Sequence, residues 1–276
     1  GVTNASSTAA AIVTLGSGLG QTFTGTGAGV QTVTLGGAGQ SATGGTGADQ
    51  FAATRANALG SSFTGGLGTD TLTLTAIGAD MSFGATAVSG GAVALSSIET
   101  IAATLTAAAT LTITPDAATT INFTGGFAET IAGTGSTITV GKVAAETLTL
   151  SGTSNYVVTG GTTGAITSTA TGTLTVTSGD GAFTLTSSGT ASLDTGTAGT
   201  GGTRIITLAG NGNKTVTGLG SVAANVVTLT EAAAANTGTL TVTTTDASAS
   251  TITQAATGTA AGAFILNATG GAGTGV

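Results

Sequence analysis

The chain has no cysteine, no histidine and no tryptophan, and only 5% of its residues are charged. Without histidine or cysteine it cannot build a Ser-His or Cys-His nucleophile, and it lacks the usual ligands of a zinc cluster. Its 11 acidic residues are spread thinly along the sequence, with no local pair of the kind that a glycosidase needs. We therefore expect that the protein is not an enzyme.

Basic residues are almost as scarce. The four that occur are Arg55, Lys142, Arg204 and Lys214. So few cations cannot cover a phosphate backbone, which argues against nucleic-acid binding. No segment approaches the roughly 18 consecutive apolar residues that mark a membrane-spanning helix. We expect neither a nucleic-acid partner nor membrane insertion.

Glycine, threonine, alanine and serine fill most of the sequence, and there are 49 glycines. The mean hydropathy of +0.47 is too high for a disordered chain, in which low hydropathy is combined with high net charge. Large apolar side chains are sparse, so the core must be thin, which suits stacked repetitive architectures. No signal peptide is evident at the N-terminus and the C-terminal end is a glycine-rich run, which favours a processed chain or a piece of a longer protein.

Threonine alternates with apolar residues throughout the chain. Strict alternation is typical of half-buried strands, and threonine, valine and isoleucine suit a pleated surface. Clusters of glycine, asparagine and serine separate these segments, as expected at turns. Clear examples are Thr22–Thr24, Thr32–Leu35, Thr71–Thr75, Thr110–Thr114, Thr137–Val140, Thr147–Leu150, Thr173–Thr177, Thr215–Thr217, Thr239–Thr243 and Thr251–Thr253.

The spacing of these segments predicts an all-β fold: an irregular parallel β-solenoid of short strands with glycine-rich turns and little helix. Apolar residues recur about every nine positions between 148 and 193, and about every twelve from 216 onward. Ala107–Ala109 and Ala232–Ala235 could each form one helical turn or a tight loop. We expect a glycine-rich region over 1–105 and a Thr/Ala-rich region over 106–276, or one continuous domain.

Two segments fit the nonapeptide Gly-Gly-x-Gly-x-Asp-x-apolar-x, at 44–52 and at 65–73. This pattern is that of a calcium-binding β-helix repeat. Glycines allow a tight turn that aims carbonyl oxygens inward, and the aspartate adds a carboxylate for a cation that takes about six to eight oxygens. Asp49 and Asp70 are 21 residues apart, a plausible length for one coil, so they could lie on adjacent coils and share an ion.

The predicted calcium ligands all come from these two nonapeptides; they are Gly45, Gly47, Asp49, Gly66, Gly68 and Asp70. The alternative is that the segments are ordinary glycine turns with solvated aspartates. The segment 36–40 looks like a copy without the aspartate, and the segment 179–183 around Asp180 is a weaker candidate that reads more readily as a turn. Whether Asp80 or Glu99 joins a calcium site stays open at this point.

The two nonapeptides resemble those of repeats-in-toxin proteins exported by type I secretion. The segment Ser96–Ile101 is similar to a stretch common in the Thr/Ala/Gly-rich surface-layer proteins of that group. The specific motifs cover residues 36 to 101. The resemblance implies calcium-dependent folding outside the cell and self-assembly into a lattice or filament.

We therefore expect a secreted, non-enzymatic structural subunit of a bacterial surface layer or extracellular filament. Its partners would be further copies of itself, and a cell-surface polysaccharide is a second candidate. The alternatives are an adhesin stalk or an ice-binding β-solenoid module of a larger secreted protein, because threonine ladders in register could order water. A third interpretation is a secretion or folding domain cut from a larger enzyme or toxin.

Overall fold

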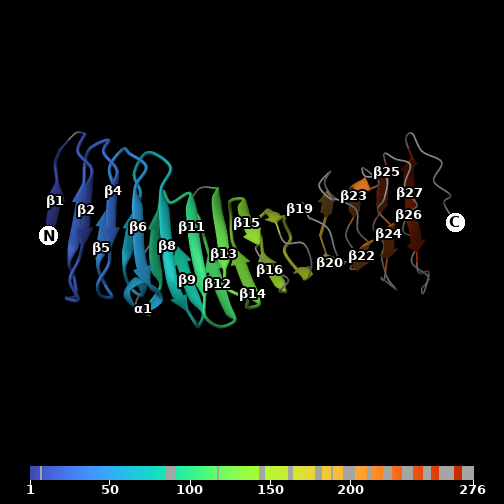
Figure 1. Ribbon diagram of the computed structural model, residues 1–276, viewed down its shortest axis with the longest axis horizontal. Coiled ribbons are helices and arrows are strands. Elements are labelled where there is room, and N and C mark those ends of the chain that lie inside the picture. The colour runs from blue at the N-terminus through green and yellow to red at the C-terminus, as the bar shows by residue number, and fades with distance from the viewer. Residues whose placement is uncertain are drawn as a thin grey trace. The chain divides into compact units, whose positions relative to one another are not determined.

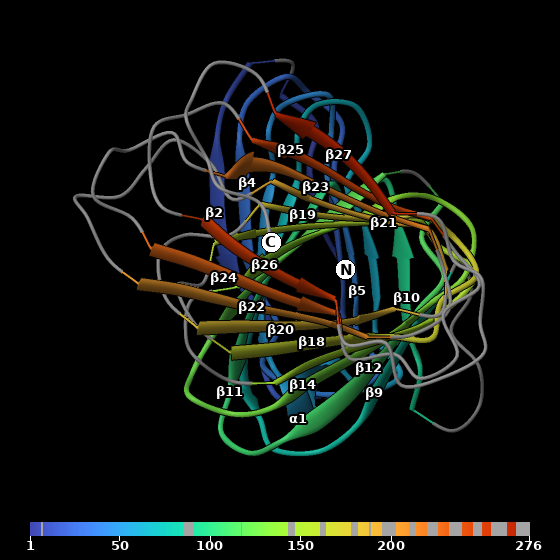
Figure 2. The ribbon, with the colours of Figure 1, turned by 90° about the vertical axis from the view of Figure 1, so that its right-hand side faces the viewer.

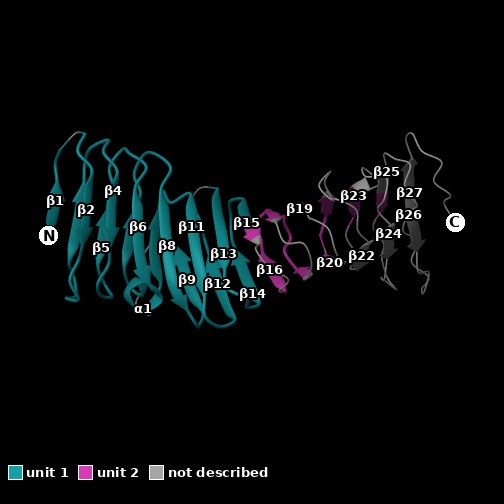
Figure 3. Ribbon diagram, in the orientation of Figure 1, with its two compact units in different colours: residues 1–140 teal, residues 141–276 magenta. Residues whose placement is uncertain are grey.

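The computed structural model is an almost purely β protein in which parallel strands form two sheets. It describes residues 1–276 except 7, 85–90, 117, 143–146, 161–163, 178–181, 188, 195–202, 210–212, 220–225, 232–238, 245–249, 255–263 and 269–276. The chain divides into two compact units, Gly1–Val140 and Gly141–Val276, which Figure 3 colours separately. The division expected between 105 and 106 falls inside the first unit, directly after the strand Thr100–Leu105.

Unit 1 winds as a parallel β-solenoid, so that successive coils place strands side by side (Figure 1). In order across sheet 1, its strands are β1 (Val2–Asn4), β3 (Thr22–Gly25), β5 (Ser41–Thr43), β7 (Ser62–Thr64), β10 (Val93–Ser96), β9 (Met81–Gly84), β12 (Ala109–Ile113) and β14 (Glu129–Gly133). Those of sheet 2 are β2 (Ala11–Thr14), β4 (Gln31–Thr34), β6 (Gln50–Thr54), β8 (Thr71–Ile77), β11 (Thr100–Leu105) and β13 (Thr119–Thr124). The strand β15 (Ile138–Lys142) spans the division.

Unit 2 repeats the same winding, and Figure 2 shows its two sheets as two layers. Sheet 1 there contains β16 (Leu148–Gly152), β18 (Gly164–Ser168), β20 (Ala182–Ser187), β22 (Thr203–Ala209), β24 (Val226–Glu231) and β26 (Ser250–Gln254). Sheet 2 contains β17 (Tyr156–Gly160), β19 (Leu174–Thr177), β21 (Ala191–Asp194), β23 (Lys214–Leu219), β25 (Leu240–Thr244) and β27 (Phe264–Ala268). The predicted irregular parallel β-solenoid of Thr-x-Thr strands is confirmed.

The alternation in the sequence decides which side chains enter the core. In β8 the leucines at 72 and 74 are fully buried, while the threonines between and beside them face outward. Large and small side chains alternate between neighbouring coils at one position of sheet 1, where Ala42 of β5 pairs with Phe23 on one side and with Phe63 on the other. The ring of Phe51, in sheet 2, meets that of Phe63 edge-on at a centroid distance of 5.9 Å.

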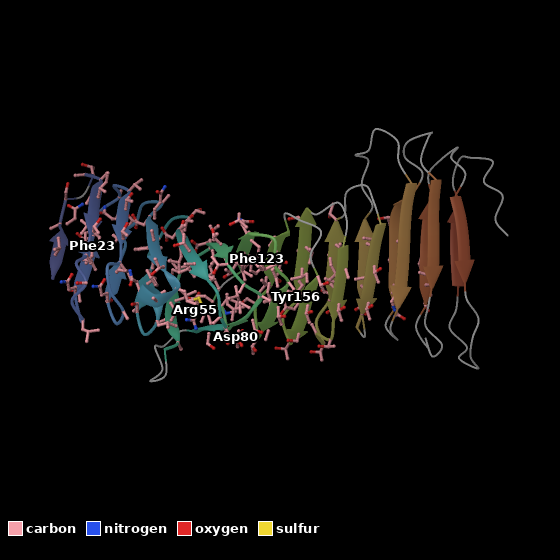
Figure 4. All side chains as sticks on the ribbon, turned by 60° about the horizontal axis from the view of Figure 1, so that its bottom comes forward. Phe23, Arg55, Asp80, Phe123 and Tyr156 are labelled. Carbon is pink, nitrogen blue, oxygen red and sulfur yellow. The ribbon has the colours of Figure 1, made fainter. Side chains whose placement is uncertain are left out.

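The core of unit 2 is built in the same way. Among its described residues, the largest fully buried side chain is Tyr156, whose hydroxyl donates a hydrogen bond of 2.6 Å to the carbonyl oxygen of Ser151 (Figure 4). This bond satisfies the one polar atom that the ring carries into the core. Leu148 pairs with Ile166 across sheet 1, and Tyr156 pairs with Leu174 across sheet 2. A spacing of about nine residues is therefore half a coil: one strand and one turn.

The coils differ in length, and the turns absorb the difference. One such insertion is the single helix of the described residues, α1 (Arg55–Ala58), which follows β6 directly. The side chain of Arg55 donates to the carbonyl oxygens of Ala79 and Asp80 and so ties α1 to the next coil (Figure 4). Of the two alanine segments, Ala107–Ala109 leads into β12, whereas Ala232–Ala235 lies outside the described residues.

A second irregularity lies in sheet 1. The consecutive strands β9 and β10 both belong to this sheet, and the later strand β10 pairs with β7 while β9 pairs with β12. All of these pairings are parallel. One coil therefore contributes two strands to sheet 1, and the regular pairing of alternate strands resumes at β12.

Candidate functional site: a column of buried polar side chains

The two predicted calcium turns occupy equivalent positions in adjacent coils. Each follows a strand of sheet 1 and ends at an aspartate that immediately precedes a strand of sheet 2. Because Gln50 pairs with Thr71, Asp49 and Asp70 lie one coil apart. The expectation that 21 residues form one coil is confirmed, since the backbone N–H of Asp49 donates a 2.6 Å hydrogen bond to Oδ1 of Asp70.

The column extends beyond the two aspartates. Gln31 precedes Asp49 by one coil, and Glu99 follows Asp70 by one coil. Each acid accepts from the backbone N–H of the member before it: Asp49 from Gln31, Asp70 from Asp49 and Glu99 from Asp70. The coils joined in this way have lengths of 18, 21 and 29 residues, so one arrangement serves coils of very different length. We call Gln31, Asp49, Asp70 and Glu99 the polar column.

Asp49 is fully buried and both of its oxygens are occupied. Oδ1 accepts from the backbone N–H of Gln31, and Oδ2 accepts from the backbone N–H of Gly45, each at 2.6 Å. Hydrogen bonds from N–H groups to a carboxylate are stronger than bonds between neutral groups. The carboxylate therefore closes its own turn through Gly45 and joins that turn to the previous coil through Gln31.

Asp70 is equally buried, but only one of its oxygens is satisfied. Oδ1 accepts from the backbone of Asp49, whereas Oδ2 has no hydrogen-bond partner. Burial raises the pKa of this carboxyl from 3.8 to about 6; the N–H bond from Asp49 opposes the rise, and the carboxylates of Asp49 and Glu99 add to it. An unpaired buried oxygen of this kind is costly to keep charged.

The glycines of the motif are required because of close packing. A Cβ at Gly44 would lie 2.2 Å from Oδ2 of Asp49, and one at Gly65 would lie 2.2 Å from Oδ2 of Asp70. The predicted ligands Gly45 and Gly47 pack their backbones on the carbonyl oxygens of the previous coil, and Gly66 and Gly68 do the same one coil later. The last two also have φ values of 105° and 122°, which favour glycine.

Backbone hydrogen bonds also join these turns to the neighbouring coils. The oxygen of Gly27 accepts from the N–H of Thr46, and that of Gly45 accepts from the N–H of Leu67. Both carboxylate oxygens of Asp49 and the carbonyl oxygen of Gly45 are therefore already occupied by N–H donors. Within the described part of the chain, no three His, Cys, Asp or Glu side chains gather where they could hold a metal ion.

In one other turn, a glutamine takes the role of the aspartate. In the segment 36–40, Oε1 of Gln40 accepts from the N–H of Gly36, four residues earlier, as Oδ2 of Asp49 does from Gly45. Its amide nitrogen donates to the carbonyl oxygens of Gly16 and Gly18 in the previous coil. This segment precedes a strand of sheet 1, on the other side of the coil. A neutral amide can therefore close such a turn as well.

Sequence reasoning missed the glutamines and left Glu99 open. The signal was present in the position of these residues, since each stands immediately before a strand or as its first residue. The weaker candidate around Asp180 lies largely outside the described residues, and no contact of that aspartate is described.

The comparisons with known proteins found no match: no family model, curated protein or solved structure resembles this chain closely enough to count. Among the described residues, no helix is long and apolar enough to cross a membrane. The evidence on function is therefore the geometry of the folded chain and the motifs in its sequence.

The raised pKa of Asp70 predicts an unusual pH dependence. Because the folded chain binds this proton more tightly than the unfolded chain, the carboxyl contributes stability below about pH 4, and that contribution is lost as the pH rises through about 6. In chelator, lowering the pH from 7.5 to 5 should therefore stabilise the wild type relative to Asp70→Asn, by about 1.4 kcal/mol. Urea unfolding of both chains at several pH values measures this difference, and parallel pH profiles would contradict it.

Proposed function

We propose that this chain is a secreted, non-enzymatic structural module that assembles with further copies of itself into a bacterial surface layer or extracellular filament. The observation that carries the proposal is an uncharged hydroxyl surface on sheet 1 of unit 1. Thr3, Thr24, Thr43 and Thr64 pair in register along β1, β3, β5 and β7. A second row is formed by Thr22, Ser41 and Ser62.

This surface, the hydroxyl face, consists of Thr3, Thr22, Thr24, Ser41, Thr43, Ser62 and Thr64. None of these side chains is charged, so two such faces can approach each other without repulsion. They can also exchange hydrogen bonds, as Thr104 and Thr124 do between neighbouring strands of sheet 2, with 2.8 Å between their hydroxyl oxygens. A cell-surface polysaccharide, which is rich in hydroxyl groups, is a second partner compatible with this face.

The similarity of the two nonapeptides to repeats-in-toxin sequences supports calcium as the cofactor and type I secretion as the export route. In this proposal, calcium stabilises the glycine-rich turns 44–49 and 65–70 and so keeps the sheets in register for assembly. The unpartnered oxygen of Asp70 supports a cation in this region. Binding a cation to the folded form alone stabilises it by mass action.

Negative-stain electron microscopy of the full chain tests the assembly. We expect sheets or fibres in calcium that disperse when a chelator is added. The double variant Thr43→Lys/Thr64→Lys should abolish them, because it places adjacent positive charges on the hydroxyl face.

The matched control is Gln50→Lys/Thr73→Lys, which adds the same charge on sheet 2, at residues that are exposed. It should leave the assemblies intact. Single particles in calcium at high protein concentration would contradict the proposed assembly and would favour an adhesin stalk within a larger secreted protein.

Ice binding is a second candidate that one observation favours. The coils vary in length, but the strands of β3, β5 and β7 stay in register, so their hydroxyls form straight rows. The varying number of residues per coil therefore does not disturb the hydroxyl face. It would do so only if neighbouring strands were shifted out of register. A thermal hysteresis assay distinguishes this function: hysteresis that disappears in Thr43→Lys/Thr64→Lys would support it, and its absence in the wild type would exclude it.

A further inference from the structure

The unsatisfied oxygen of Asp70 lies against the next coil rather than the previous one. A Cβ at Gly65 would be 2.2 Å from Oδ2 of Asp70 and 1.9 Å from the main-chain oxygen of Ser97. These two oxygens therefore crowd the same side of Gly65. Both are hydrogen-bond acceptors, and Oδ2 of Asp70 has no donor. Two acceptors held together in a buried place repel each other unless a cation or a proton lies between them.

The turn that contains Ser97 is held in an uncommon conformation. Ser97 has a φ of 51°, in the left-handed region that non-glycine residues rarely adopt. The carboxylate of Asp116 maintains it, because Oδ2 accepts from the backbone N–H of Ser97 at 3.0 Å and from the hydroxyl of Ser96 at 3.1 Å. Asp116 thus fixes the turn in which the Ser97 oxygen faces Gly65.

Glu99 completes the surroundings. One of its oxygens, Oε2, accepts from the backbone N–H of Asp70 at 2.7 Å, and its negative charge adds to the raised pKa of Asp70. Glu99 is only partly buried, so this end of the column is open to solvent. Among the described residues, no ion pair joins either acid to a positively charged side chain, and burial is the main cause of the raised pKa of Asp70.

We propose that Asp70 Oδ2, the main-chain oxygen of Ser97 and the carboxylate of Glu99 bind one calcium ion, with water as the remaining ligands. The ligands are all oxygens, and one is a backbone carbonyl, a combination that suits calcium better than magnesium. The site lies between the second nonapeptide and a turn outside either nonapeptide. It deepens the proposed calcium dependence and rests on it, but it moves the ion one coil away from Asp49.

The role of Asp49 then differs from that of Asp70. Both oxygens of Asp49 are already occupied by N–H groups, so it serves as a turn-closing group. Asp70 has one oxygen for the backbone and one for the ion. The two nonapeptides thus separate into a structural copy and a binding copy, because Oδ2 of Asp49 accepts from the N–H of Gly45, whereas Oδ2 of Asp70 has no hydrogen-bond partner.

Calorimetric titration of the full chain with calcium chloride, and separately with magnesium chloride, tests the site. We expect calcium to bind the wild type and to bind Glu99→Gln and Asp70→Asn at least about tenfold more weakly, since each loses a charged ligand. Asp49→Asn should change the affinity much less than either of these variants, because it removes a nearby charge but no ligand. Asp80→Asn is the matched control, because it removes one exposed negative charge. The amide oxygen of asparagine can still accept the hydrogen bond that the backbone N–H of Thr110 donates to Oδ1 of Asp80.

The outcomes separate the location of the ion from the proposed function. Loss of affinity in Asp49→Asn with full affinity in Glu99→Gln would overturn the location and place the ion between the nonapeptides, with calcium dependence intact. No heat of calcium binding in the wild type would overturn both the site and the calcium part of the proposed function. Circular dichroism in chelator checks that each variant is folded, and a rise in Tm on adding calcium to the wild type alone would support the site independently.

Discussion

Replacing Gly65 by alanine should destabilise the protein more than any other single methyl group added to the glycine-rich turns. Its Cβ would lie 1.9 Å from a backbone oxygen, that of Ser97, and 2.2 Å from a buried carboxylate oxygen of Asp70. Neither group can move without breaking the packing between two coils. We expect a loss of about 3–5 kcal/mol, or roughly 10 °C in Tm, measured by thermal unfolding of the full chain.

Gly84→Ala is the matched control. Gly84 lies at the end of β9, and a Cβ there would meet no atom within 4 Å. Its replacement should change the free energy of unfolding by less than about 1 kcal/mol, because alanine also restricts the unfolded chain. Equal Tm values for Gly65→Ala and Gly84→Ala would show that the turn 65–70 does not pack against Ser97 as described.

Removing the side chain of Asp49 should have a comparable effect. Asp49→Ala deletes two 2.6 Å hydrogen bonds and leaves the N–H groups of Gln31 and Gly45 without acceptors in a buried place. The expected cost is about 3–5 kcal/mol, most of it the penalty of the unsatisfied donors. Urea unfolding in chelator at pH 7.5 measures it in the absence of any bound ion.

Asp49→Asn separates the hydrogen bonds from the charge. The amide keeps one acceptor oxygen and removes a negative charge that disfavours the ionised form of Asp70. It should therefore cost clearly less than alanine, and Gln40 shows that an amide oxygen can close a turn of this type. If the alanine and asparagine variants were equally stable in chelator, the carboxylate would not be the group that closes the turn.

The fold could be predicted because its signal is local. Alternation of threonine and apolar residues, as in Thr71–Thr75, defines which face of a strand is buried without knowledge of its partner. The helix α1 was missed because four residues between a strand and a turn carry no periodic pattern. The inverted order of β9 and β10 was equally hidden, since nothing in either strand specifies which neighbour it pairs with.

The site could be predicted only in part, because the alignment of residues in different coils leaves no local signal in the sequence. The nonapeptides identified Asp49 and Asp70, and their separation by one coil followed from the sequence. Gln31 and Glu99 could not be placed, because their coils have 18 and 29 residues, and only the strand register shows that all four residues align. The sequence also treats the two aspartates as equivalent, whereas their neighbours leave one satisfied and the other with a free oxygen.

Amide hydrogen exchange, measured by NMR in chelator, tests the polar column most directly. Each acid protects the backbone N–H of the column member before it. Asp49→Ala should therefore accelerate exchange most at Gln31 among the column amides, Asp70→Ala at Asp49, and Glu99→Ala at Asp70. If each substitution accelerates exchange of the column amide in the preceding coil, the result supports the column. Two results would contradict it: fast exchange of all three amides in the ion-free wild type, or acceleration of the same amide in all three variants.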